Sequence, residues 1–330
     1  DGKHPSLTCG TSSGKVFIHS PHDKAADRTA TGVRFLNINR KVTALATGCF
    51  DKDTGKWVVL IGTETNLLAY DVEGNSDVFY KDVPDGVHRV VFGSIPSVGV
   101  PLAIVGGHCS VQGFDIEGTE SFWTVTGDNV SALALVDTNG DGVDELVVGS
   151  DDFEIRIFKD DDVLEEVTET DKILDLCPIA ASGSRFGYAL SNGTVGVYDN
   201  TSRLWRLKAK SQVSCITSYD IDADGVPELI TGWTSGKIDA RREHNAELVY
   251  KDSFAHPVSA MVKADYRLDG REDLICCALD GEVRGYLPAD ADTREALLVD
   301  RPDERLIKTL QDEKAKLELE LRGLESNMKS

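Results

Sequence analysis

The chain has 330 residues, of which 41% are apolar, and its 35 basic and 56 acidic residues give a formal net charge of −21. That length and apolar content allow a sizeable core. The acidic balance disfavours nucleic acid as a partner, because phosphate backbones are bound by clustered Lys and Arg. No apolar run approaches the roughly 18 residues of a membrane span.

A recurring sequence pattern divides the chain into repeats. Its clearest copies begin at Val130 and Val213, and each continues with a small apolar stretch, an Asp/Gly-rich turn and a strongly apolar segment. Equivalent openings are separated by 40 to 45 residues and fall at Val42, Val87, Val130, Ile173, Val213 and Val258. A period of this size predicts a repeat fold.

The first unit lacks such an opening. Asp1 and Gly2 align with Asp224 and Gly225, which follow the opening stretch of a later unit. We therefore expect the innermost strand of the first unit to lie upstream of Asp1, in a longer protein of which this sequence is a piece.

Each unit contains two kinds of strand separated by turns. Residues 145–149 are almost continuously apolar, as in a strand buried on both faces, whereas Ile155 and Ile157 alternate with charged residues, as in a half-exposed strand. No unit shows a helical apolar period. The sequence therefore predicts an all-β fold, a seven-bladed β-propeller over residues 1–299 whose first blade is incomplete at its N-terminus.

Two of the Asp-rich turns have the side chains of a cation site. Oxygen-bearing residues occupy positions 1, 3, 5 and 9 of each turn, namely Asp137, Asn139, Asp141 and Glu145, and Asp220, Asp222, Asp224 and Glu228. Several oxygens converging from a tight loop suit Ca²⁺, and the turns resemble the calcium loops of integrin α-subunit propellers. They are not EF-hands, since position 12 of the first is Val148. No cofactor is required, and the candidate ligand is a structural Ca²⁺.

A plainer interpretation of these turns stays open. Asp-Gly and Asn-Gly pairs make good hairpin turns, with Asp side chains accepting hydrogen bonds from nearby backbone amides. In a third copy, which begins at Asp265, Arg267 occupies position 3, where a fixed positive charge substitutes for an ion.

Other residue types point to packing rather than chemistry. Seven cysteines without Cys-x-x-Cys spacing favour buried free thiols and a reducing compartment. The four tryptophans, which we expect to pack between blades, are Trp57, Trp123, Trp205 and Trp233. No Ser/His/Asp or Cys/His arrangement is visible, so we expect no enzyme.

After the last blade, residues 300–330 change character. Pro302 suits a first helical turn, and the following residues are rich in Leu, Glu and Lys. A heptad register places apolar residues and one lysine on a single seam: Ile307, Leu310, Lys314, Leu317, Leu321, Leu324 and Met328. The pattern predicts the start of a coiled-coil helix, and a helix that folds back onto the propeller is the alternative.

The residues beside the seam favour an unlike partner. In that register Glu313 and Glu320 occupy g positions, and Glu318 and Glu325 occupy e positions. Two parallel copies would set acid against acid, so a heteromeric coiled coil with a basic-flanked partner is expected.

Several longer segments resemble one known family. They are residues 65–71, 122–129, 184–199, 228–233 and 280–288, and they are similar to the amino-terminal half of the Bardet-Biedl syndrome 2 family. The likeness runs from Asp1 to the start of the terminal helix.

The resemblance implies a non-enzymatic scaffold or adaptor subunit of the BBSome, a coat-like complex that moves membrane proteins to and from cilia. It implies a coiled coil with the related subunit seven, a propeller near subunit nine, contact with ciliary membrane-protein cargo, and peripheral membrane association through the complex. The implied locations are the cytoplasm, the cilium and its membrane, the basal body and the centriolar satellites.

Two readings from other classes stay open. A calcium-dependent, integrin-like adhesion propeller shares the Asp-rich turns, and it predicts disulfides and glycan at a sequon such as Asn192. A propeller hydrolase needs acid and base groups that converge at the central channel.

Overall fold

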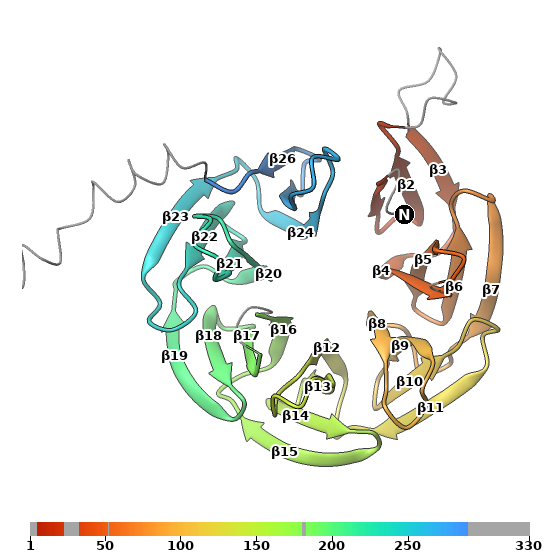
Figure 1. Cartoon of the computed structure of the whole chain (residues 1–330), viewed down its shortest axis with the longest axis horizontal. Helices are drawn as coiled ribbons and strands as arrows, with labels where there is room; N and C mark the ends of the chain where they lie inside the picture. Colours follow the sequence, from red (N-terminus) through yellow and green to blue (C-terminus); the bar gives the residue numbers. More distant parts are fainter. Residues whose placement is uncertain (1–4, 23–32, 52, 180–182, 290–330) are drawn as a thin grey trace, which may run out of the picture. The chain divides into compact units, whose positions relative to one another are not determined.

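The computed structural model describes residues 5–22, 33–51, 53–179 and 183–289 (Figure 1). The chain divides into two compact units, Asp1–Ile221 with Gly225–Leu287, and Asp222–Asp224 with Pro288–Ser330. All strands of the described residues lie in the first unit, and most of the second lies outside the described residues.

The strands form seven antiparallel sheets, which we call blades 1 to 7 in chain order. Blades 1 and 2 contain β1 (Leu7–Gly10), β2 (Lys15–His19), β3 (Val33–Asn37), then β4 (Val42–Asp51), β5 (Lys56–Thr63), β6 (Asn66–Asp71) and β7 (Ser76–Asp82). Blades 3 and 4 contain β8 (Arg89–Ser94), β9 (Pro101–Gly106), β10 (Ser110–Phe114), β11 (Glu120–Val125), then β12 (Val130–Val136), β13 (Glu145–Ser150), β14 (Glu154–Lys159) and β15 (Asp162–Thr168).

The remaining blades repeat this plan. Blades 5 and 6 contain β16 (Ile173–Pro178), β17 (Arg185–Leu190), β18 (Thr194–Asp199), β19 (Ser202–Lys208), then β20 (Val213–Tyr219), β21 (Glu228–Trp233), β22 (Lys237–Arg241) and β23 (Leu248–Ser253). Blade 7 contains β24 (Val258–Ala264), β25 (Asp273–Ala278) and β26 (Val283–Tyr286). The compact unit that holds the strands is thus the seven-bladed, all-β propeller that the repeat predicts. The first strands of blades 2 to 7 lie around its centre, and the last strands lie on the rim (Figure 1).

Blade 1 begins at a different point of the repeat from blades 2 to 6. Its three-stranded sheet has the order β1-β2-β3, and β1 has the sequence position that second strands such as β21 hold in other blades. The innermost strand expected upstream stays a prediction, and the boundary at residue 299 lies outside the described residues.

The apolar core lies between neighbouring blades. One cluster of buried side chains joins Val147 and Ile155 of blade 4 to Phe186 and Tyr198 of blade 5, and equivalent clusters join the other successive blades from 1 to 7. Burial of this apolar area between sheets is the main stabilising term of such a fold.

A repeated glycine brings successive blades close together. A Cβ atom at Gly149, in β13, would collide with the side chain of Ile173, the first residue of β16. A Cβ atom at Gly106 in blade 3 would meet Val130 of blade 4 in the same way, one blade earlier. In blades 2, 3, 4 and 6 the apolar segment therefore ends in Gly, because the opening residue of the next blade fills the space. Blade 5 has Ala189 at this position.

Two expectations about packing are wrong in part. Of the tryptophans, Trp233 is buried, but Trp57 is 44% and Trp123 is 54% exposed, because both lie on strand positions that no neighbouring blade covers. All seven cysteines are free, as expected, yet only Cys177 and Cys276 are fully buried and Cys109 is exposed, since it lies in the β9–β10 turn.

Candidate functional site

The three Asp-rich turns share one backbone plan. They connect the first and second strands of blades 4, 6 and 7, and in each the first carboxylate accepts a hydrogen bond from the amide of the glycine at position 6. The distances are 2.8 Å for Gly142 to Asp137, 2.8 Å for Gly225 to Asp220 and 2.9 Å for Gly270 to Asp265. These glycines have φ angles of 85°, 90° and 84°, a region that disfavours side chains.

The carboxylate at position 9 anchors each turn from inside. Glu145, Glu228 and Asp273 are 2%, 1% and 3% exposed, and each is the first residue of a second strand. A buried carboxylate needs hydrogen-bond donors, so the rest of each turn must supply them.

In the Asp137 turn the protein itself uses the predicted ligand atoms. Thr138 donates to Glu145 through its amide and its hydroxyl, both at 2.8 Å, and Asn139 Nδ2 donates to Glu145 Oε1 at 2.6 Å. Asp141 accepts a hydrogen bond from the Val143 amide, which is the main cause of its lowered pKa. This geometry matches the plainer interpretation, a turn closed by its own hydrogen bonds.

The Asp220 turn brings three predicted ligands together. Carboxylate oxygens of Asp220, Asp222 and Asp224 lie within 4.8 Å of one another, the only such group of acidic, His or Cys side chains among the described residues. Glu228 is outside the group. Its Oε2 accepts from the Ile221 amide at 3.1 Å, and its Oε1 lies 3.8 Å from Arg242.

The Asp265 turn places a guanidinium where the sequence predicts it. Arg267 Nε donates to Asp273 at 3.1 Å, and an Arg267 NH group lies 2.7 Å from Asp269. Position 3 is therefore a donor in two turns, Asn139 and Arg267, and an acid in the third.

The side chain at position 3 determines whether the turn closes on its own position 9 carboxylate, as Asn139 and Arg267 do, or adds another carboxylate, as Asp222 does. Asp222 is 7% exposed, and an ionised carboxylate has no hydrogen to donate to position 9. Of the predicted ligands, Asp220, Asp222 and Asp224 are the residues that could hold a hard cation such as Ca²⁺. The predicted coiled-coil seam, from Ile307 to Met328, lies outside the described residues.

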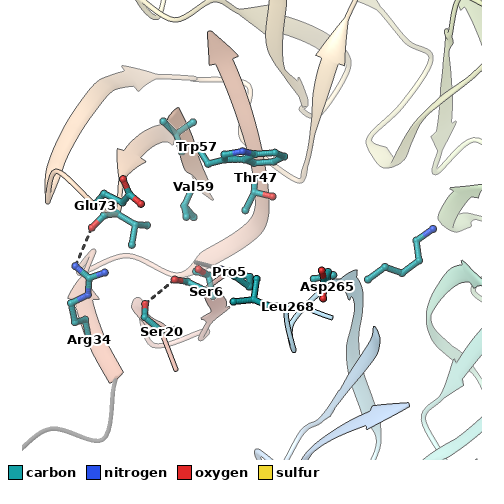
Figure 2. Close-up of a pocket in the computed structure, with 15 residues that line it drawn as sticks. Pro5, Ser6, Ser20, Arg34, Thr47, Trp57, Val59, Glu73, Asp265 and Leu268 are labelled. Atoms are coloured by element: carbon teal, nitrogen blue, oxygen red, sulfur yellow. Dashed lines mark hydrogen bonds between the residues drawn. The ribbon is translucent and has the colours of Figure 1, made fainter. Parts of the chain in front are cut away.

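Sequence reasoning missed a cavity of about 680 Å³ in the propeller (Figure 2). Blades 1, 2 and 7 build it, with Pro5 and Ser6 before β1, Trp57 in β5, and Lys263 and Leu268 at the end of β24 and in the turn beyond it. The Ser6 and Ser20 hydroxyls are 2.7 Å apart in its wall. The exposed face of Trp57 borders this cavity, but cations and carboxylates line it together and favour no one class of ligand.

Blade 7 is tied to blade 1 beside this cavity. His19 Nδ1 lies 2.5 Å from the Tyr266 hydroxyl, and His22 Nε2 lies 2.7 Å from the Tyr266 carbonyl oxygen. Burial raises the pKa of Tyr266. The partners are more than 240 residues apart in the chain, so no local sequence pattern announces either the contact or the cavity.

Membrane insertion by a helix finds no support in the part of the chain that the structure covers, where no helix has the length and apolarity of a span.

Comparison with known proteins identifies the family. The N-terminal model of ciliary BBSome complex subunit 2 matches residues 1–93, and the middle-region model of the same subunit matches residues 132–241. The human protein "BBSome complex member BBS2" is 50% identical over 339 residues, which cover 100% of this chain and 47% of the relative. The Caenorhabditis elegans protein "BBSome complex member bbs-2" is 40% identical over 253 residues, or 76% of this chain and 34% of the relative.

Solved structures share the fold. BBS1N, in a crystal structure with ARL6DN, has a TM-score of 0.70 at 13% identity, covering 88% of this chain and 89% of that one. The WD40 propeller of Doa1 has a TM-score of 0.64 at 14% identity, covering 87% and 90%.

Together, the fold and the family matches define a β-propeller of the kind found in a family of ciliary BBSome subunits. The chain belongs to the BBSome complex subunit 2 family, and it spans about half the length of the curated relatives it matches.

Proposed function

We propose that this chain is a non-enzymatic scaffold or adaptor part of the BBSome, which moves membrane proteins to and from cilia. The observation that carries the proposal is the 50% identity, over the whole chain, to the human BBSome complex member. A propeller suits this role because a stiff ring of sheets holds many loops at fixed positions, each available to a different protein.

The terminal residues supply the assembly contact in this proposal. The seam from Ile307 to Met328 pairs with the related subunit seven, and the acidic flanks at Glu313 and Glu320 select an unlike helix. The propeller lies near subunit nine and contacts ciliary membrane-protein cargo, and the membrane association is peripheral. The proposed locations are the cytoplasm, cilium, ciliary membrane, basal body and centriolar satellites.

Co-expression with subunit seven tests the assembly role. Light scattering of the purified material should give the mass of a one-to-one complex. Replacing Leu310 and Leu317 together by Asp should abolish it, because two charges enter the seam. The control is Lys316→Asp, which lies off the seam and should leave the complex intact. Recovery of a homodimer, or equal loss in the control, would contradict the proposal.

The calcium-dependent adhesion alternative shares the propeller fold and the Asp220 turn with these findings. It requires paired cysteines and glycan, whereas all seven cysteines are free. Intact-mass measurement of the protein from its natural source separates the two, since adhesion predicts added sugar at Asn192.

A further inference from the structure

Among the strands that the structure describes, none pairs with the outer edge of β11. β11 is the last strand of blade 3, in the order β11-β10-β9-β8, and Figure 1 shows it on the rim. On its paired side, the Thr126 amide donates to the Cys109 carbonyl oxygen at 2.9 Å. Because backbone groups of a strand point alternately to its two sides, those of Val125 and Trp123 point away from β10. Within the described residues, no strand meets them.

The same two residues present apolar side chains to solvent. Trp123 is 54% and Val125 is 56% exposed, whereas Phe122 and Thr124 are 7% and 6% exposed on the opposite face, which packs toward blade 4. An incoming strand would therefore find free backbone groups and an apolar side-chain surface at one place.

The other rim strands carry charged residues in their interior, and β11 does not. Each of β3, β7, β15, β19 and β23 contains an internal charged residue, such as Arg34, Lys81, Glu165, Arg206 or Lys251. In β11 the only charge is Glu120, at the first position, and residues 121–125 have none. Charges on exposed edges oppose the pairing of further strands, so β11 is the rim strand that is open to it.

The surrounding charge selects a basic occupant. Residues 90–155 contain 11 Asp and Glu and no Lys or Arg. Glu117 and Glu120 precede the apolar stretch of β11, and Asp128 follows it. A segment with Lys or Arg would gain from this field.

We propose that the rim edge of β11 binds an extended basic segment of a partner protein as an added strand of blade 3. Alternate apolar side chains of that segment pack on Trp123 and Val125, and its basic side chains face Glu120 and Asp128. The residues that carry this proposal all lie in or beside β11 of blade 3, so it stands whether or not the assembly role does.

Fluorescence anisotropy with the whole chain and a labelled peptide, Lys-Val-Arg-Val-Lys-Val-Arg, tests the proposal. The peptide should bind saturably and more weakly as salt rises. Trp123→Ser should weaken binding by about tenfold, since the anchoring ring is lost without a change of charge. The matched control is Tyr80→Ser on β7, where the side chain is 55% exposed and Lys81 and Asp82 follow. Both sites are exposed, and circular dichroism checks that both variants fold.

Two altered peptides separate strand pairing from charge. In the first, methyl groups replace the hydrogens of the backbone amides on the peptide edge that pairs with β11, and binding should be abolished. In the second, Glu replaces every Lys and Arg, and binding should again be abolished. Any of four results would overturn the proposal: no binding of the basic peptide, equal binding of the methylated one, equal loss in both serine variants, or a dimer of the chain that Trp123→Ser dissolves.

Discussion

The backbone of Gly149 lies directly against the side chain of Ile173, at the point where blade 4 meets blade 5. The contact is tight because glycine leaves the space that the first residue of the next inner strand occupies. Gly149→Val should therefore destabilise the propeller by about 1–3 kcal/mol through overpacking. Urea unfolding followed by tryptophan fluorescence measures the change.

A matched glycine provides the control for that substitution. Gly285 in β26 has open space around an added Cβ and no positive φ angle. Gly285→Val, the same substitution at this open position, should change the free energy of unfolding by less than about 0.5 kcal/mol. Equal losses at the two positions would show that the seam between blades tolerates added volume.

The donor at position 3 and the acid at position 9 have complementary lengths. In the Asp137 turn a short Asn139 meets a long Glu145, and in the Asp265 turn a long Arg267 meets a short Asp273. Arg267→Asn alone should cost about 1–2 kcal/mol, because the buried Asp273 loses a donor. Adding Asp273→Glu should restore most of the loss. A double variant that is less stable than Arg267→Asn would contradict this length rule, and thermal unfolding provides the comparison.

The Asp220 turn is the place where we expect calcium to bind. Isothermal titration should show binding of Ca²⁺ that Asp222→Ala abolishes, because position 3 contributes an oxygen to the cluster. Asn139→Ala, in the self-closed turn, should leave the titration unchanged. Binding that survives Asp222→Ala would place the ion elsewhere, and no binding would leave the turn as a structural hairpin only.

Alkaline pH should weaken the fold through Tyr198. Burial, with a hydrogen bond to Glu169, raises the pKa of Tyr198 to about 12, whereas an unfolded tyrosine ionises near pH 10. A raised folded pKa contributes stability below about pH 10 that is lost as pH rises toward 12. The free energy of unfolding, measured with urea from pH 8 to 11, should fall less steeply with pH for Tyr198→Phe than for the unmodified chain. Tyr80→Phe, at an exposed site, should follow the unmodified chain, and identical slopes for all three would refute the assignment.

The repeat made the ring predictable, and the local turns followed from it. The spacing of Val130, Ile173 and Val213 marks the inner strands, and Gly142 and Gly225 mark positions where the backbone requires a positive φ. These are local properties, so one sequence contains them. The place of Arg267 at position 3 also predicted that a fixed positive charge would lie inside the turn, where it pairs with Asp273.

Contacts between blades that are far apart in the sequence could not be predicted in this way. The bond from Tyr266 to His19 and the cavity beside Trp57 depend on how blade 7 meets blade 1, which no neighbouring residues encode. The exposure of Trp123 escaped notice for a similar reason: a strand pattern shows which residues alternate, and only the twist of the sheet shows which face a neighbour covers.

The shared turn separates architecture from ion dependence. Its first carboxylate, its glycine and its buried anchor hold the backbone in all three copies, while an amide, a carboxylate or a guanidinium stands at the third position. If the Asp220 turn binds Ca²⁺ as we propose, a single substitution at the third position would add or remove such a site, with the path of the chain unaltered. On that proposal, related propellers could gain or lose a calcium site in one blade without changing the others.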